Sequence, residues 1–294
     1  MSPAQDAPPL EPRPFEASGP AGNVLRGESA GEGPRVVQLH GITAARRYVT
    51  HGSKALQRSG FEAVIYDARC HGESDPAPAS EGAGYTYAEL AGDLEAVLDV
   101  LDPGTGPVIL AGHSMGAHTA TTFALAHPDR VAGLVIIGPV SRGELPGDDT
   151  LAYWDGLAAG LASGGVDGFM AVYERQDHDP TWRETILRLA RQRLELHRHP
   201  RELARALSEV PRSLPFEGIE ALEGLEVPAL VVASRDDADP GHPYETAREW
   251  AERLPRARLV SEGEGESPLS WQGGKLSREI AAFASESPVR EGLG

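Results

Sequence analysis

The sequence of 294 residues contains a single cysteine, Cys70, so no disulfide can form within the chain. A chain of this kind does not require an oxidising compartment. Its longest apolar run, VAGLVIIGPV, is far shorter than the ~20 residues that a membrane-spanning helix needs. The first residues, MSPAQDAPPLEPRPFEASGP, have neither the basic segment nor the apolar segment of a secretory signal. These absences predict a cytoplasmic protein that does not span a membrane.

Positive charge is also scarce, since 27 lysines and arginines face 44 aspartates and glutamates and the net charge is -17. A field of this sign repels nucleic acids and anionic membranes, so we expect neither as a partner. The sequence has no cysteine cluster and no His-Glu-x-x-His spacing for a metal. No glycine-rich phosphate-binding pattern follows a strand-like run. We therefore expect no metal and no cofactor; the oligomeric state is left open.

Short apolar segments alternate with helical patterns along most of the chain. Apolar segments of this kind are typical of strands that are buried on both faces. Their alternation with helices predicts the α/β class, with a mostly parallel central sheet covered by helices on both faces. The segments are VVQLHG (36–41), AVIYDAR (63–69), PVILAGHS (107–114), AGLVIIGPV (132–140), PALVVAS (228–234) and ARLVS (257–261).

The alternation stops between residues 141 and 222, where helical patterns occur without any strand-like run. We expect this stretch to form a helical cap over the carboxyl end of the sheet. The proline-rich residues 1–22 are expected to form a flexible tail. The predicted organisation is thus a tail, a core formed by residues 23–140 and 223–288, and a helical cap formed by 141–222.

One motif points directly to chemistry. Residues 112–116, Gly-His-Ser-Met-Gly, fit the pattern G-x-S-x-G and lie between a predicted strand and a predicted helix. In this arrangement, called a nucleophile elbow, the serine sits on a tight turn where larger side chains at the two glycine positions would collide. The free N–H groups at the start of the helix point toward the reaction centre. The motif therefore predicts that Ser114 is a nucleophile.

With this motif, the sequence resembles the α/β-hydrolase fold family. His40 and Gly41 end the first clear strand in the same way, and YDARCHGESD (66–75) is similar to the family's D-x-R-G-H-G-x-S-D segment, with Cys70 in place of a glycine. The resemblance implies an oxyanion hole formed by the backbone N–H groups of Ile42 and Met115. It also implies a triad whose members follow in the order serine, acid, histidine.

The resemblance places the acid in the loop after residues 228–234, which contains three aspartates. Asp239, with Pro243 four residues later, is our first choice. Asp237 is the alternative, because an ungapped count from the start of the strand favours it. Asp236 also has a proline four residues later.

The histidine that the family carries after its last strand is absent. Residues 263–268 read GEGESP, so that Glu266 stands at the usual histidine position, and no histidine follows His242. Glu266 is one candidate base: an ordinary glutamate is about two pKa units more acidic than histidine, but burial near other carboxylates raises its pKa. His242, three residues after Asp239, is the other candidate.

These residues predict a hydrolase of a small ester, lactone or related acyl substrate. Ser114 attacks the acyl group, the oxyanion hole holds the tetrahedral intermediate, and water releases the acid. The alternative is a catalytically altered or inactive scaffold that binds a small molecule without acyl transfer. In both cases the expected partner is a small molecule.

Overall fold

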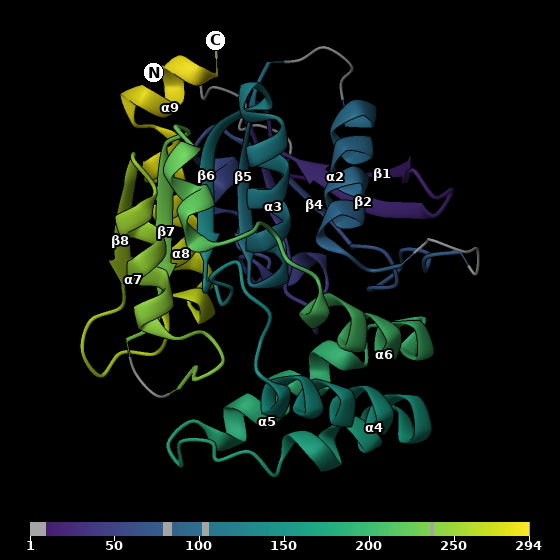
Figure 1. Cartoon of the computed structure of the whole chain (residues 1–294). Helices are drawn as coiled ribbons and strands as arrows, with labels where there is room; N and C mark the ends of the chain where they lie inside the picture. The colour runs from purple at the N-terminus through teal and green to yellow at the C-terminus, as the bar shows by residue number, and fades with distance from the viewer. Residues whose placement is uncertain (1–9, 79–83, 102–105, 236–237, 294) are drawn as a thin grey trace, which may run out of the picture.

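The computed structural model describes residues 10–78, 84–101, 106–235 and 238–293 (Figure 1). Within these ranges, eight strands form one sheet in the order β1-β2-β4-β3-β5-β6-β7-β8. The six strands from β4 to β8 in this order all pair in parallel, which confirms the predicted, mostly parallel sheet. The strands are β1 (Arg13–Ser18), β2 (Val24–Ala30), β3 (Arg35–Leu39), β4 (Glu62–Tyr66), β5 (Val108–His113), β6 (Val131–Ile137), β7 (Ala229–Ala233) and β8 (Ala257–Ser261).

Helices cover both faces of the sheet, as the apolar character of its strands requires. Neighbouring residues of β3 show the two faces: Val37 packs into the core beneath α2, α3 and α7, whereas Val36 packs into the core beneath α1, α8 and α9. The fold is therefore the predicted α/β class. These helices are α1 (Ala55–Arg58), α2 (Tyr87–Leu101), α3 (Met115–Ala126), α7 (Tyr244–Arg253), α8 (Gly273–Ala284) and α9 (Ser287–Gly292).

The amino-terminal part of the chain corrects one prediction. Residues 13–18 of the expected flexible tail form β1, the edge strand, which pairs antiparallel with β2. Its single proline, Pro14, is tolerated because an edge strand has one side without ladder partners. Ala17 is 2% exposed and packs into the core of the sheet. The sequence did not indicate this strand because the segment is rich in proline and the strand has few inward apolar side chains. Residues 1–9 of the expected tail lie outside the described part.

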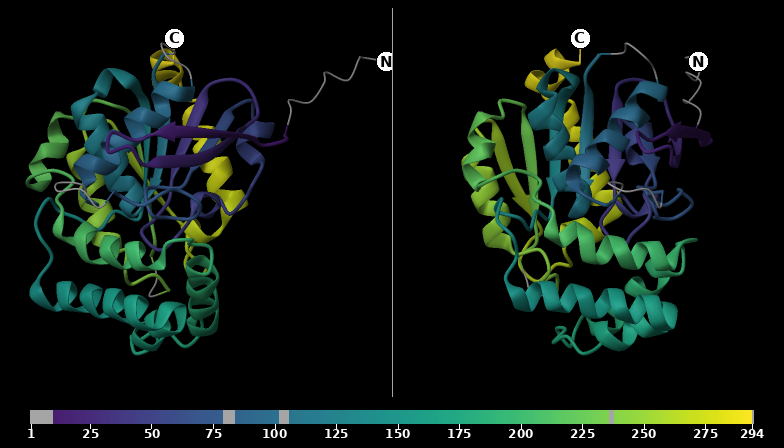
Figure 2. Two further views of the ribbon diagram at one scale, coloured as in Figure 1. Left: turned by 90° about the vertical axis from the view of Figure 1, so that its right-hand side faces the viewer. Right: turned by 45° about the vertical axis from the view of Figure 1, so that its right-hand side comes forward.

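Residues 141–222 contain three α-helices and no strand: α4 (Asp148–Tyr173), α5 (Arg183–Leu194) and α6 (Pro200–Glu209). We call this stretch the helical insertion. Figures 1 and 2 show its helices as a separate layer at one end of the sheet, away from the helices that cover the sheet's faces. Its apolar core also includes Ile42 and Met115, which follow β3 and β5. Among the described helices, none has the length and apolar character needed to cross a membrane.

Candidate active site

Ser114 lies on the sharp turn between the end of β5 and the start of α3. Its φ of 52° and ψ of -114° are unusual for a residue with a side chain. A Cβ added to Gly112 would collide with the carbonyl oxygen of Gly116, and one added to Gly116 would collide with that of Leu39. Both positions therefore admit only glycine, and the turn has the strained geometry of a nucleophile elbow.

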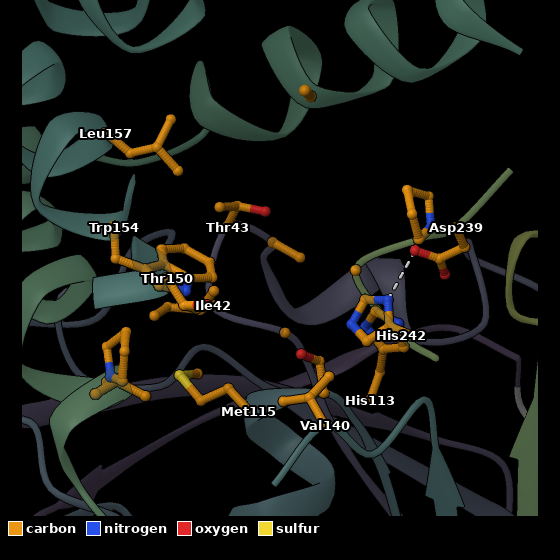
Figure 3. Close-up of a pocket in the computed structure, with 18 of the residues that line it drawn as sticks. Ile42, Thr43, His113, Met115, Val140, Thr150, Trp154, Leu157, Asp239 and His242 are labelled. Carbon is orange, nitrogen blue, oxygen red and sulfur yellow. Dashed lines mark hydrogen bonds and ion pairs between the residues drawn. The ribbon is translucent and has the colours of Figure 1, made fainter. Parts of the chain in front are cut away.

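The serine lines a pocket of about 910 Å³, which lies between the carboxyl end of the sheet and the helical insertion. This volume is within the range of about 300–1,000 Å³ that is typical of small-molecule sites. Figure 3 shows Trp154 and Leu157 of α4 on one side of the pocket and His113, Asp239 and His242 on the other. The pocket thus combines an apolar wall with a polar corner.

Asp239 and His242 form the centre of that polar corner. They are the first and last residues of a turn that the His242 amide closes by donating to the Asp239 carbonyl oxygen at 3.0 Å. Nδ1 of His242 also lies 2.8 Å from Oδ1 of Asp239, as the dashed line in Figure 3 shows. The side chain of His242 is only 18% exposed and that of Asp239 only 14%. Because Nδ1 donates to the carboxylate, Nε2 is the nitrogen that can accept a proton.

The charges around this pair favour the ionised form of the Asp239 carboxyl group. Burial alone would raise the pKa of Asp239, but His242, followed by His113 and Arg193, outweighs this effect and the net pKa is lowered. Burial and the nearby His242 lower the pKa of His113 to about 3. The rings of His113 and His242 have centroids 4.9 Å apart. His113 is therefore uncharged at neutral pH and adds no positive charge beside His242.

The two amides expected to form an oxyanion hole both belong to pocket-lining residues, Ile42 and Met115. Met115 is the first residue of α3, where the backbone N–H groups have no partner within the helix. The carbonyl oxygen of Gly41 accepts from the Ala44 amide at 2.9 Å and from His40 Nδ1 at 2.9 Å. In a trans peptide the N–H points away from the carbonyl oxygen, so these bonds fix the direction of the Ile42 N–H.

Two buried histidines near the site support the backbone. His118 accepts through Nε2 from the amides of Val140 and Ser141, at 3.1 and 3.2 Å. His40 accepts through Nε2 from the Ala68 amide at 3.0 Å. Burial lowers the pKa of each imidazole to about 3. Both are neutral acceptors that hold loops beside the pocket.

Glu266, one of the two candidate bases, lies away from the pocket lining. The structure therefore does not support the prediction that Glu266 acts as the base. Its side chain is 53% exposed and accepts from Lys275 Nζ at 2.6 Å. The hydrogen bond from Lys275, with one from the Gly263 amide, lowers the pKa of Glu266 instead of raising it. An exposed carboxylate with a lowered pKa is a poor base at neutral pH.

A second glutamate after β8, Glu262, is buried, although it was not among the candidates predicted from the sequence. Glu262 is 2% exposed and accepts from the amides of Leu269, at 3.0 Å, and Arg235. It therefore joins the segment after β8 to the start of the loop that carries Asp239. Its position directly after a strand is the signal that could have found it. Asp236 and Asp237 lie outside the described residues.

One group of side chains in the described ranges could hold a metal ion, namely His113, Asp239 and His242, whose ligand atoms lie within 4.8 Å of one another. Two imidazoles and a carboxylate are ordinary ligands for zinc and similar metals. The Asp239 oxygen already accepts a hydrogen bond from His242, so binding a metal would compete with that pair. The absence of a resident metal stays a prediction.

The fold and the site together define a class. A strained serine follows a central parallel strand, a histidine–aspartate pair lines the same pocket, and two loop amides border it. This is the arrangement of an α/β hydrolase. A sequence model of the family described as alpha/beta hydrolase fold matches residues 34–273, and the chain belongs to this family.

Individual relatives and a solved structure show which α/β hydrolases this chain is similar to. The chain is 35% identical over 132 residues to the mouse sn-1-specific diacylglycerol lipase ABHD11, a match that spans 45% of this chain but only 40% of that relative. It is 30% identical over 215 residues to 2-hydroxy-6-oxononadienedioate/2-hydroxy-6-oxononatrienedioate hydrolase 2 of Pseudomonas putida, spanning 70% and 73% of the two chains. A thermophilic esterase from Thermogutta terrifontis shares the fold, with a TM-score of 0.77, 21% identity and coverage of 96% and 100%.

Proposed function

We propose that this protein is a serine hydrolase that cleaves a small ester, lactone or related acyl substrate. The observation that carries the proposal is the position of Ser114, on a strained elbow that lines the same pocket as the hydrogen-bonded pair of Asp239 and His242. Backbone strain of this kind persists where the surrounding structure holds it, and it is concentrated at functional sites. The names of the relatives, a lipase and a hydrolase among them, are consistent with this chemistry.

In the proposed reaction, Nε2 of His242 takes the proton from the Ser114 hydroxyl as its oxygen attacks the acyl carbon. Asp239 keeps the proton on Nδ1 and stabilises the imidazolium that forms. The amides of Ile42 and Met115 donate to the developing oxyanion. His242 then gives its proton to the departing alkoxide. Water attacks the acyl-enzyme by the same route, which releases the acid and restores Ser114.

The helical insertion supplies the remaining part of the proposal. Pocket-lining residues of α4, including Trp154 and Leu157, give an apolar surface that suits the hydrocarbon part of an acyl or alcohol group. We propose that residues 141–222 act as a cap that encloses the substrate and limits the access of bulk water to the reaction centre. The hydrolase core would then comprise residues 13–140 and 223–292, which include β1 and α9.

A fluorophosphonate probe and p-nitrophenyl acetate test the proposal, with Ser114→Ala as the matched variant. We expect the unaltered protein to be labelled and to hydrolyse the ester, and the variant to lose the label and about 10³-fold or more in turnover. If the unaltered protein neither takes the label nor exceeds the variant in turnover, acyl transfer is excluded. The alternative, a scaffold that binds without acyl transfer, predicts that second result.

A further inference from the structure

Arg193, the penultimate residue of α5, lines the pocket from the side of the helical insertion. Its Nε atom is shielded from solvent and has no hydrogen-bond partner. Within the described ranges, the guanidinium makes no hydrogen bond and no ion pair. A buried N–H donor without an acceptor is unfavourable. Nε–H is one of the five N–H donors that a guanidinium carries in a rigid planar fork. The pocket therefore contains a cation whose hydrogen-bonding capacity is unused.

Neighbouring arginines differ in this respect. Arg142 also lines the pocket, but its Nε donates to Glu249 at 2.6 Å. Arg191, two residues before Arg193 on the same helix, donates to Asp167 at 2.7 Å. In a chain with a net charge of -17, carboxylates are abundant. Most of the arginines in the described ranges form an ion pair with one. An arginine that faces the pocket without a carboxylate partner is therefore the exception that needs explaining.

The guanidinium lies near groups from four different segments. Its positive charge contributes to the lowered pKa of Asp239, which His242 lowers most, and to the lowered pKa values of His113 and His51, for which burial is the main cause. It also opposes the rise that burial causes in the pKa of Tyr173. Asp239 follows β7, His113 ends β5, His51 follows β3, and Tyr173 ends α4. The charge is therefore within electrostatic reach of the acid–base pair, although it is not in ion-pair contact with Asp239.

We propose that Arg193 binds a carboxylate of the substrate, so that the ester or lactone cleaved at Ser114 carries a second, free carboxylate. The proposal rests on the proposed function and names its substrate class. The overall negative charge repels anions, so an anionic substrate needs a local cation in the pocket. A carboxylate matches the guanidinium fork with two parallel hydrogen bonds, whereas a substrate without an acceptor at this place leaves the buried Nε–H unpaired.

Two esters with the same acyl chain length test the proposal: p-nitrophenyl butyrate and the mono-p-nitrophenyl ester of succinic acid, which differ by a terminal carboxylate. We expect the unaltered protein to prefer the succinate ester. Arg193→Gln should lower kcat/KM for the succinate ester by about 10- to 100-fold and change the butyrate value by less than about threefold. Because the ratio of the two values is compared within one protein, a loss of folded protein does not affect it.

Arg188→Gln is the matched control, since Arg188 lies on the same helix and is exposed. It removes the same charge at a position outside the pocket lining and should leave the preference unchanged. A second pair, 4-acetoxybenzoate and phenyl acetate, places the carboxylate on the alcohol side instead. If Arg193→Gln loses the preference for the carboxylate in only one of the two pairs, that pair identifies the side of the substrate on which the carboxylate lies.

Two results overturn the proposal. One is an equal loss for both members of each pair in Arg193→Gln, which would mean that Arg193 acts only through Asp239 and His242. The other is an unaltered protein that shows no preference for a carboxylate in either pair.

Succinate binding separates this inference from the proposed function. Calorimetry on Ser114→Ala, with and without Arg193→Gln, measures carboxylate binding without any turnover. If the unaltered protein has no esterase activity but succinate binding depends on Arg193, the hydrolase proposal fails and the carboxylate site stands. If the unaltered protein has no esterase activity and its succinate binding does not depend on Arg193, the hydrolase proposal and the carboxylate-site proposal both fail.

Discussion

Nδ1 of His242 lies 2.8 Å from Oδ1 of Asp239, and the two residues open and close a single four-residue turn. Pro240 restricts the backbone at the second position of this turn. The acid and the imidazole are therefore held together by four consecutive residues rather than by two separate loops. In the proposed mechanism, this local pair takes the place of the histidine that the family carries after its last strand.

The pair can be tested by removing each member. We expect Asp239→Asn and His242→Ala to lower kcat for an ester such as p-nitrophenyl butyrate by about 10³- to 10⁴-fold, because the first leaves the imidazole in the wrong tautomer and the second removes the base. Glu266→Gln is the control and should stay within about twofold, because surface substitutions usually have small effects. A large loss in Glu266→Gln with full activity in His242→Ala would assign the base to Glu266 instead.

Gly138, which follows β6, gives a second test of the same geometry. Its φ is +56°, and an added Cβ would lie 3.0 Å from Cγ and Cδ2 of His242. Alanine here is expected to displace the imidazole and to cost about 1–2 kcal/mol in backbone strain. We predict that Gly138→Ala lowers kcat/KM by at least about tenfold while the protein stays folded by circular dichroism.

The control for this substitution is Gly224→Ala, because a Cβ at Gly224 would meet nothing within 4 Å. It should leave both activity and folding unchanged. Unaltered kinetics in Gly138→Ala would show that His242 has room to move without consequence, and would remove the reason for placing it in the mechanism.

The parts of this structure that follow from the sequence are those with local causes. Buried parallel strands are apolar along their length, so β5, β6 and β7 are visible as short runs. The elbow at Ser114 is visible because the motif places a glycine on either side of the serine; a Cβ at Gly112 would collide with Gly116 within the same turn, whereas one at Gly116 would collide with Leu39 on β3. The strands and the glycine at position 112 need no knowledge of distant contacts.

Other parts depend on packing between distant segments. The position of Glu266 depends on the path of the chain after β8, and that path turns Glu262 inward and Glu266 toward Lys275. Helix α5 contains four arginines, and the packing of the helical insertion decides that Arg193 lines the pocket. A pattern along the sequence does not contain this information.

The family-like segment 66–75 provides a stability prediction. Arg69 donates to both carboxylate oxygens of Asp93 on α2, at 2.6 and 2.8 Å, and both side chains are 1% exposed. Removing the Asp93 carboxylate leaves the buried guanidinium of Arg69 with Glu89, 3.5 Å away, as its remaining carboxylate partner in the described ranges. Asp93→Asn should therefore lower the free energy of unfolding by about 3–5 kcal/mol, measured by urea denaturation.

The matched control is the exposed pair of Asp155 and Arg212, in contact at 2.7 Å. Asp155→Asn should change the free energy of unfolding little, because water screens exposed ion pairs. Equal effects of the two substitutions would contradict the view that Arg69 is a buried structural element.

The last prediction concerns the loss of folding stability at acidic pH that is caused by His118. Burial lowers the pKa of this imidazole from 6.5 to about 3 in the folded protein. Below pH 6.5 the unfolded chain therefore binds more protons than the folded one, so the contribution of His118 to stability is complete above this pH and is lost as the pH falls toward 3. Its protonation would also remove the acceptor for the amides of Val140 and Ser141.

His118→Gln isolates this contribution, because glutamine offers an acceptor that does not titrate. The other buried histidines titrate equally in both proteins and cancel in the comparison. Between about pH 7 and about pH 5, the unaltered protein should lose about 2 kcal/mol more unfolding free energy than the variant. Urea denaturation at the two pH values measures this difference. The same loss in both proteins would mean that His118 is already protonated when the protein is folded, or that it is accessible to solvent.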